Sequence, residues 1–275
     1  MRLRDLSLSV LAWAAACVHS AATPSPTRDL SMRVMTYNIA AGHGDLEKTR
    51  AAIAAAQPDL VALQEVDVHW DARSNFVDQA ATLGERLGMH VRFAHIYDFP
   101  GASTGAPERK YGVALLSKYP IVGFINHPIT RLSTQQEGAP PMPMPGFLEA
   151  RIDVHGTWVR VFDTHTDYRK DPSVRRTQVA EMLAVIGNSS MPTLLLGDLN
   201  APPDASELQP LLARLHDAWP ASAGPGLTYP SDHPVKRIDY VLTSSHFRVR
   251  SARVPVTEAS DHRPVVVDLI ASGIR

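Results

Sequence analysis

Short apolar runs of strand length alternate along the chain with segments whose apolar residues recur every three or four positions. The first pattern predicts strands and the second predicts amphipathic helices. We expect strands over residues 33–39, 60–66, 112–117, 148–154, 158–164, 193–196, 238–243, 248–256 and 265–270. We expect helices over residues 45–56, 76–87, 172–186 and 208–215. This mixture predicts mixed β-sheets covered by helices rather than a purely parallel sheet.

Local signals define several element ends. Asp45 can cap the first helix, and Gly88 is a suitable terminator for the second. The pair His155-Gly156 predicts a hairpin turn, and Asp171-Pro172 predicts a helix start with a cap and a proline at the first helical position. Pro210 is expected to interrupt the last helix near its beginning.

Three stretches rich in proline and glycine, residues 98–110, 130–146 and 220–236, are expected to form ordered loops at the rim of a site. No change in composition separates their flanks, so they are not domain linkers. We therefore expect one domain over residues 32–271, preceded by a linker over residues 23–31.

The N-terminal 22 residues have the pattern of a secretory signal peptide. Two early arginines precede the apolar run LSLSVLAWAAAC, which is too short to span a bilayer, and small polar residues follow it. Cleavage after Ala22 predicts a secreted or periplasmic protein without cysteine. The alternatives are a lipoprotein anchored through Cys17, the single cysteine, and an uncleaved hydrophobic anchor.

Composition narrows the class of partner only a little. The net charge is −1, and no run of like charges suggests a basic arm or an acidic tail. This balance argues against nucleic-acid binding driven by overall charge, although a local basic patch would still permit it.

Several predicted strands end on polar residues that the interior of a sheet would not accommodate. Such residues close the runs VMTYNI, LVALQEVD, VRVFDTHTD, LLLGDLN and RIDYVL, and the segment ASDHRPVVVDL opens with more of them. An unpaired polar side chain is costly to bury, so a shared site is the economical interpretation.

The residue types in this set indicate phosphate-ester chemistry with a hard divalent cation. Magnesium prefers oxygen ligands and takes one or two protein carboxylates, for which Glu65 and Asp261 are candidates, with Asn38 nearby. Asp198 can orient or deprotonate a water molecule, and Asn200 points the same way along an extended chain. The sequence lacks a closely spaced histidine pair, which counts against a structural zinc site.

The motifs TYNI, LVALQEVD, YGVALLSKYPI, DTHTD, LLLGDLNAPPD, RIDYVL and SDHRPVVVDL, in this order, resemble those of the endonuclease/exonuclease/phosphatase superfamily. This superfamily includes deoxyribonuclease I-like enzymes, exonuclease III-like nucleases, sphingomyelinases and inositol polyphosphate 5-phosphatases. Each motif is weak alone, whereas the ordered set is specific and spans residues 33–269. The segment DARSNFVDQAATLGERLGM also resembles a bacterial branch of secreted, metal-dependent hydrolases. The resemblance implies a four-layer αββα sandwich of two mixed β-sheets flanked by helices, with the site at one edge.

The resemblance also implies roles for the acidic and amide residues. Glu65 resembles the metal-binding glutamate, Asn38 the asparagine beside it, and Asp261 a second carboxylate near the metal. Asp198 resembles the aspartate that activates water. Asn200 resembles the asparagine that positions the water and the phosphate.

The remaining predicted roles belong to two histidines and a tyrosine. His262 resembles the histidine that contacts the scissile phosphate, oriented by Asp239. His165 corresponds to a second catalytic histidine of deoxyribonuclease-like members, and Tyr111 to a tyrosine that contacts phosphate.

Two departures from the superfamily pattern bear on these roles. Ala40 stands where some members have an acidic residue, which argues against a second metal site. Gly112 and Val113 follow Tyr111 where a glutamate partner for the second histidine is expected, so a general-acid role for His165 lacks its partner.

The resulting hypothesis is a monomeric, secreted, Mg²⁺- or Mn²⁺-dependent hydrolase that cleaves a phosphodiester, or a phosphomonoester, by in-line attack of water. A small molecule or a lipid head group is the favoured substrate. The alternatives are a secreted endonuclease acting on DNA or RNA and, in another class, a catalytically silent surface binding protein on the same fold.

Overall fold

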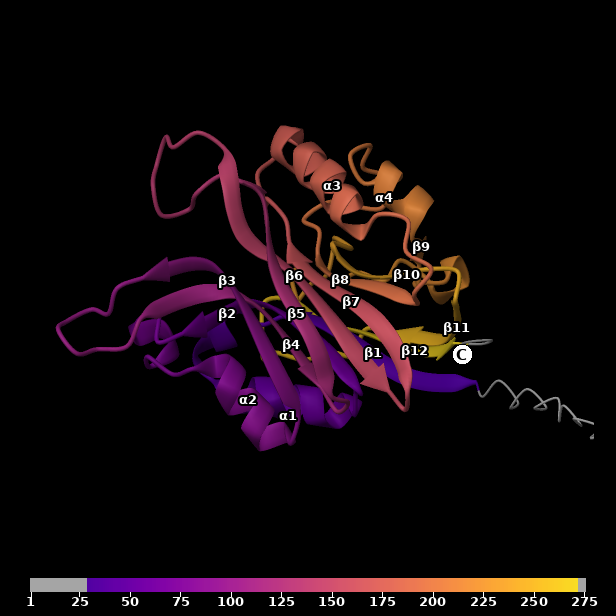
Figure 1. Ribbon diagram of the computed structural model, residues 1–275, viewed down its shortest axis with the longest axis horizontal. Coiled ribbons are helices and arrows are strands. Elements are labelled where there is room, and N and C mark those ends of the chain that lie inside the picture. The colour runs from indigo at the N-terminus through magenta and orange to yellow at the C-terminus, as the bar shows by residue number, and fades with distance from the viewer. Residues whose placement is uncertain (1–28, 272–275) are drawn as a thin grey trace, which may run out of the picture.

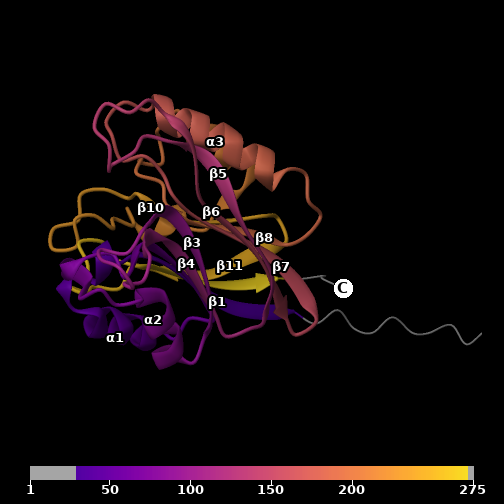
Figure 2. The ribbon, with the colours of Figure 1, turned by 60° about the vertical axis from the view of Figure 1, so that its left-hand side comes forward.

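The computed structural model describes residues 29–271, which form two packed six-stranded β-sheets (Figures 1 and 2). The first sheet has the strand order β11-β12-β1-β2-β4-β3. Its strands are β1 (Leu30–Asn38), β2 (Leu60–Val68), β3 (His90–Phe99), β4 (Arg109–Ser117), β11 (Phe247–Arg253) and β12 (Val265–Ala271). The second sheet has the order β5-β6-β7-β8-β10-β9. Its strands are β5 (Ile121–Arg131), β6 (Met142–Val154), β7 (Thr157–His165), β8 (Thr193–Asp198), β9 (His216–Asp217) and β10 (Asp239–Thr243).

Helices cover the outer face of each sheet. On opposite sides of the sandwich lie α1 (Leu46–Ala56) with α2 (Gln79–Leu87), and α3 (Ser173–Ile186) with α4 (Gln209–Arg214) (Figure 2). Short 3₁₀ turns, η1 (Ala40–Gly44), η2 (Ala72–Ser74) and η3 (Ala221–Ala223), lie in the loops. The pairs β1–β2 and β7–β8 are parallel and the other pairs are antiparallel. The predicted sandwich of two mixed sheets flanked by helices is therefore confirmed.

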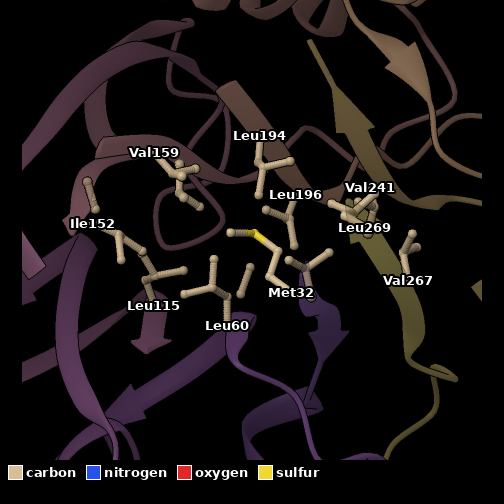
Figure 3. Packing of buried hydrophobic residues seen from close by; sticks show 14 of the residues in the cluster. Met32, Leu60, Leu115, Ile152, Val159, Leu194, Leu196, Val241, Val267 and Leu269 are labelled. Atoms are coloured by element: carbon tan, nitrogen blue, oxygen red, sulfur yellow. The ribbon is translucent and has the colours of Figure 1, made fainter. Parts of the chain in front are cut away.

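The main core lies between the two sheets and is built from the inward face of each strand (Figure 3). Along β1 the inward residues change from Met32 and Val34 to Thr36 and Asn38, and along β8 they change from Leu194 and Leu196 to Asp198. Because side chains of a strand alternate between faces, these are continuous rows that turn from apolar to polar. The polar ends of the rows therefore meet at one edge of the sandwich.

A polar contact at this transition also joins the sheets. Gln64 on β2 donates from Nε2 to Oδ1 of Asp163 on β7 at 2.7 Å, and to the hydroxyl of Thr36 at 3.2 Å. All three side chains are fully buried. Burial raises the pKa of Asp163 well above its ordinary value, which favours the neutral acid in this setting.

Two helix ends follow the predicted chemistry closely, and a third is displaced by one residue. Asp45 accepts hydrogen bonds from the backbone N–H groups of Glu47 and Lys48 at the start of α1. Gly88 ends α2 with φ of 64°, the left-handed conformation that suits glycine. Pro172 lies one position earlier than expected, at the N-cap of α3.

Two expectations about the regular elements were wrong. Residues 76–78 are not helical: α2 begins at Gln79, capped by Asp78, and Phe76 is half exposed with φ of 54°. Pro210 does not interrupt α4, because it lies in the first turn, where its missing N–H has no partner to lose.

The stretch 130–146 is only partly a loop. Strand β5 extends to Arg131 and β6 begins at Met142, with Pro143 facing Thr130. Pairing of β6 with β7 starts only at Leu148, so the prolines lie where β6 has a neighbour on one side. An edge position tolerates proline because no second ladder needs its N–H.

The predicted signal peptide, with Cys17 as an alternative lipid anchor, lies outside the described residues. Among residues 29–271, no helix combines the length and the apolar character needed to cross a membrane.

Candidate active site

Three neighbouring strands of the second sheet bring polar side chains into one row. Asp198 at the end of β8 lies beside His165 of β7 in the parallel register and opposite Asp239 of β10 in the antiparallel register. Gly197 permits this close packing, since a Cβ at its position would lie 2.1 Å from the carbonyl oxygen of Thr164. The glycine in LLLGDLN therefore lets the strand that carries Asp198 pair tightly with β7.

Asn38 joins this row to the first sheet. Its Nδ2 donates to Oδ2 of Asp198 at 3.1 Å and to Oε1 of Glu65 at 3.0 Å, while its Oδ1 accepts from the N–H of Ala40 at 3.0 Å. The three bonds fix the orientation of the buried amide. The single amide NH₂ group of Asn38 therefore bonds both the carboxylate of Glu65 and the carboxylate of Asp198.

Glu65 reaches the site through a β-bulge. The pairing of β2 with β4 shifts register between Leu63 and Val66, and Glu65 has φ of 56°. Leu63 and Val66 both pack against the helices, so regular alternation would not direct Glu65 into the cleft. The extra residue re-aims the side chain, a frequent use of bulges beside functional sites.

His262 approaches from the loop before β12. Its Nδ1 lies 2.9 Å from Oδ2 of Asp239, and its Nε2 lies 3.7 Å from Oδ2 of Asp198. The hydroxyl of Ser260 donates to the carbonyl of Asn38 at 2.7 Å and accepts from the N–H of His262 at 3.2 Å, which anchors this loop to β1. The ring of His262 is thus held by an anion on one side and faces the carboxylate of Asp198 on the other.

Asn200 and His165 complete the surroundings of Asp198. The N–H of Asn200 donates to Oδ1 of Asp198 at 2.9 Å, and its Nδ2 donates to the carbonyl of Thr166 at 3.1 Å. Nε2 of His165 lies 3.6 Å from Oδ2 of Asp198 and 4.0 Å from Oε1 of Glu65. Asp198 is therefore the centre of the cluster, with neighbours from both sheets.

These side chains line a cleft of about 420 Å³. Of the predicted site residues, Glu65, Tyr111, His165, Asp198, Asn200, Asp261 and His262 line the cleft directly. Asn38 and Asp239 are buried beneath it and contact residues that line it. All nine predicted site residues are thus gathered in one place.

Burial and the neighbouring charges set the protonation of the carboxylates. Burial and the nearby carboxylate of Asp239 raise the pKa of Asp198 to about 6. Burial also raises the pKa of Glu65, an effect that the hydrogen bond from Asn38 partly offsets. Asp198 is therefore mostly ionised near pH 7, yet basic enough to accept a proton from water.

The two histidines differ in charge. Burial alone would lower the pKa of His262, but the carboxylates of Asp239 and Asp198 outweigh it and raise the pKa to about 10. Burial lowers the pKa of His165 below its ordinary value, and the nearby charge of Arg131 lowers it further. Near pH 7 His262 is an imidazolium, whereas His165 is neutral.

The donor set fits a divalent cation. Within the described part of the chain, no lysine or arginine forms an ion pair with the carboxylates of Glu65, Asp198, Asp239 or Asp261. Ligand atoms of Asp198, Asp239 and His262 lie within 4.8 Å of one another, and the buried Oδ1 of Asp239 has no hydrogen-bond partner. The imidazolium of His262 is the one cation close to these four carboxylates among the described residues, so their ionisation is costly and a metal ion would compensate the remaining charge.

Several cleft residues were not among the predicted set. Arg131 and Tyr97 line the cleft, and Tyr168, Tyr229 and Lys236 lie along it as well. Arg131 and Lys236 belong to the stretches 130–146 and 220–236. The expectation that these stretches form loops at the rim of a site was the sequence feature that pointed to them. Tyr97 gave no signal, because it lies on β3, a strand that the sequence pattern did not predict.

Comparisons with known proteins agree with this geometry. The model of the Endonuclease/Exonuclease/phosphatase family matches residues 35–262. The YbhP protein of Escherichia coli K12 is 26% identical over 272 residues, which cover 90% of this chain and 99% of that protein. The crystal structure of an endonuclease/exonuclease/phosphatase from Beutenbergia cavernae is 26% identical, with a TM-score of 0.70, and the match covers 89% of this chain and 72% of that one.

The fold extends to more distant proteins. The catalytic domain of human Nocturnin, solved with a bound sulfate anion, has a TM-score of 0.63 at 21% identity, covering 92% of this chain and all of that one. The family model spans most of the described residues and every predicted motif from β1 to His262. The chain belongs to the endonuclease/exonuclease/phosphatase family, whose members act on phosphate esters.

Proposed function

We propose that this protein is a secreted, divalent-metal-dependent hydrolase that cleaves a phosphodiester by in-line attack of water. The observation that carries the proposal is the environment of Asp198. This carboxylate is held by Asn38 and by the N–H of Asn200, and two histidine rings lie within 4 Å of its Oδ2. A carboxylate held in this way, at the base of an open cleft, is suited to general-base chemistry on water.

Asp198 orients the water molecule and accepts its proton as the bond to phosphorus forms. A pKa of about 6 matches this task, because the group is ionised near pH 7 and still has substantial proton affinity. The hydrogen bonds from Asn38 and Asn200 hold the carboxylate in one orientation. Orientation of the attacking group contributes as much to such reactions as basicity does.

His262 binds a non-bridging oxygen of the phosphate through Nε2–H. Its Nδ1–H is committed to Asp239, which fixes the ring and stabilises the positive charge. The hydroxyl of Tyr111 stays protonated, since burial raises its pKa well above the ordinary value, and it is a second candidate donor. A preorganised cation and donor stabilise the negative charge that builds up on the phosphate oxygens in the transition state.

Glu65 and Asp261, with Asn38 beside them, are the residues that would hold a Mg²⁺ or Mn²⁺ ion. When bound, the ion supplies charge neutralisation at the phosphate and at the leaving oxygen. The Asp198, Asp239 and His262 group is the other candidate, but Nδ1 of His262 already bonds Asp239, and its Nε2 would have to give up a proton to bind the ion. Glu65 is therefore the favoured ligand.

His165 does not act as a general acid in this proposal. It is neutral near pH 7, and among the described residues it has no carboxylate within hydrogen-bond distance. Its role is to pack beside Asp198 and to offer a neutral hydrogen-bonding nitrogen to the substrate or to water.

The test is hydrolysis of bis(p-nitrophenyl) phosphate and of p-nitrophenyl phosphate by the protein lacking residues 1–22. Each ester is incubated with Mg²⁺, with Mn²⁺ and with chelator, beside Asp198→Asn and the exposed control Asp204→Asn. We expect metal-dependent turnover with a preference for the diester, which Asp198→Asn lowers by about 10²–10⁴-fold and which Asp204→Asn leaves unchanged.

Other outcomes would redirect the proposal. A preference for the monoester would make the protein a phosphatase, and cleavage of plasmid DNA without turnover of the small esters would make it a nuclease. Equal turnover in chelator would contradict the metal requirement. If every ester and plasmid DNA stay intact, the protein is a binding protein on this fold.

A further inference from the structure

The cleft extends well beyond the catalytic cluster, and the strand order shows in which direction. Across the first sheet, Glu65 lies on β2, Tyr111 on the adjacent β4, and Tyr97 on β3 at the edge. In the second sheet, β7, β6 and β5 follow β8 in this order. Arg131, at the end of β5, therefore lies toward the same end of the cleft as Tyr97. Neighbouring strands are about 4.8 Å apart, so Tyr97 lies about 10 Å from the strand of Glu65. We call this part of the cleft, lined by Tyr97, Tyr111 and Arg131, the β3–β5 end.

Aromatic rings form one wall of the β3–β5 end. The rings of Tyr97 and Tyr111 are 6.1 Å apart between centroids, and Trp70 packs against both, at 6.0 and 5.8 Å. Phe99 completes the cluster, at 5.6 Å from Trp70 and 5.9 Å from Tyr97. The hydroxyl of Tyr97 is already bonded to Thr134, at its Oγ1 and its N–H, which fixes the ring. Tyr97 is 6% exposed, so the preformed surface for a flat partner is the part of Tyr97 and Tyr111 that lines the cleft, with Trp70 and Phe99 packed behind it.

Arg131 supplies a positive charge that no ion pair among the described residues neutralises. Its side chain is 7% exposed, and its three nitrogens each donate to a backbone carbonyl, of Pro145, His165 and Gly146. A guanidinium has five N–H groups, so two remain without a partner. Among residues 29–271, no carboxylate forms an ion pair with Arg131.

The other arginines near this end are already neutralised. Arg73 lies over the ring of Tyr111 at 5.7 Å and is bound by both oxygens of Asp67. Arg169 is paired with Asp167. Arg131 is therefore the arginine at the β3–β5 end whose guanidinium is not bound by a carboxylate, and the acidic groups of Asp167 and Glu181 act on it only from a distance. The positive charge of Arg131 disfavours a cationic group such as a quaternary ammonium, although aromatic rings alone would attract one.

On this basis, and resting on the proposed function, we propose that the β3–β5 end binds a ring-shaped substituent of the phosphate ester. The ring packs on Tyr97 and Tyr111, and its acceptor oxygens bind the free N–H groups of Arg131. A nucleobase and a cyclic sugar or polyol share this chemistry. A choline head group has neither a ring nor acceptor oxygens beyond the phosphate, so the proposal excludes phosphocholine esters as the preferred substrate.

The test is a binding measurement, so that it does not depend on turnover. Isothermal titration calorimetry of the inactive Asp198→Asn protein in Mg²⁺ compares four probes: uridine 5′-monophosphate, myo-inositol 1-phosphate, methyl phosphate and phosphocholine. We expect at least one of the two ring-bearing phosphates to bind about tenfold or more tightly than methyl phosphate, since stacking on an aromatic side chain is worth about that factor. Which of the two binds more tightly distinguishes a nucleotide from a polyol phosphate.

Variants then assign the preference to the β3–β5 end. Tyr97→Leu is expected to abolish the advantage of the ring-bearing phosphate, whereas Tyr97→Phe keeps the ring and retains the advantage. Arg131→Lys, which preserves the charge but not the guanidinium geometry, is expected to weaken the ring-bearing probe without affecting methyl phosphate. Thermal melting verifies that each variant is folded, and the comparison of probes on the parent protein stands even if one variant is not.

Equal affinity for methyl phosphate and both ring-bearing probes would overturn the inference, and so would tightest binding of phosphocholine. A uniform loss for all four probes in Tyr97→Leu would assign Tyr97 a structural role instead. Failure of the proposed function would be visible separately, as absence of ester hydrolysis by the protein with Asp198 intact.

Discussion

The charge of Asp198 is costly to the folded protein, and this cost can be measured. Asp198 is 1% exposed and lies opposite a second carboxylate, and its pKa rises from 3.8 to about 6 on folding. The folded state therefore holds the proton more tightly than the unfolded chain does. Stability from this group is present below about pH 4 and is lost as the pH rises to about 6. Above about pH 6 the ionised carboxylate therefore lowers the free energy of unfolding by about 3 kcal/mol, the energy that corresponds to the difference between the two pKa values.

Asp198→Asn removes this charge and should stabilise the protein while it abolishes activity. The amide keeps the shape of the carboxylate but loses one accepted hydrogen bond, from Asn38 or from Asn200, which costs about 1 kcal/mol. The expected net gain at about pH 7.5 is therefore about 2 kcal/mol. For a domain of this size it raises the melting temperature by about 4–8 °C.

The assay is thermal and urea unfolding in chelator, because a bound cation would offset the repulsion being measured. The surface substitution Asp204→Asn in the adjacent loop serves as the matched control and should shift stability by less than about 0.5 kcal/mol. The gain of Asp198→Asn should disappear at about pH 4, where the aspartate of the parent protein is protonated as well. An Asn variant that is less stable at about pH 7.5, or a gain that does not change with pH, would refute the reasoning.

Four further outcomes follow from the site. Turnover should fall about tenfold for each pH unit below about 6, because ionised Asp198 is required; a pH–rate profile checks this, and a flat profile would contradict it. Asp239→Asn should lower kcat by about 100-fold or more while the protein stays folded, since His262 loses its anionic partner; steady-state kinetics and melting test the two parts. Glu65→Gln should raise the Mg²⁺ concentration for half-maximal activity at least about tenfold, measured by metal titration; an unchanged midpoint would favour the Asp198, Asp239 and His262 group as the ligand set. Gly197→Ala should destabilise the fold by about 2 kcal/mol or more, because the new Cβ would overlap the carbonyl of Thr164; a melting temperature equal to that of the parent protein would count against that packing.

The sequence was most informative where apolar rows end. Each row that turns from apolar to polar, such as the one from Leu194 to Asp198, contributes a side chain to the cleft or to the buried residues directly beneath it. The apolar periodicity alone indicated that these residues lie together at one edge, because several polar side chains at strand ends are explained most simply by one shared site. The assignment of roles needed the ordered motifs, because an aspartate that caps a turn and one that activates water look alike in a single sequence.

Other features depend on three-dimensional packing and left no trace in the pattern. Strand β5 contains Gly123 and Pro128, which read as breakers, yet the proline lies at a bulge where its missing N–H is harmless. The pattern also gave no reason to expect a bulge at Glu65, because its positive φ becomes acceptable only within the assembled sheet. Arg131 likewise donates to backbone carbonyls instead of a carboxylate because of its position in the fold. The carbonyls that it bonds belong to β6 and β7, and the sequence around Arg131 does not show that they lie nearby.

The position of β1 has a consequence for the order in which the fold and the proposed site are completed. This strand lies between β2, which follows it closely in the chain, and β12, the last strand of the fold. Before β12 is in place, β1 can pair on one side only and presents an open edge on the other. Closing that edge requires contacts between distant segments, which slow folding. Asp239 and His262 also lie late in the sequence, so a chain with its first sheet half formed already carries Glu65 but lacks the hydrogen-bonded pair of Asp239 and His262. The proposed site is therefore complete only when the last strand has closed the first sheet.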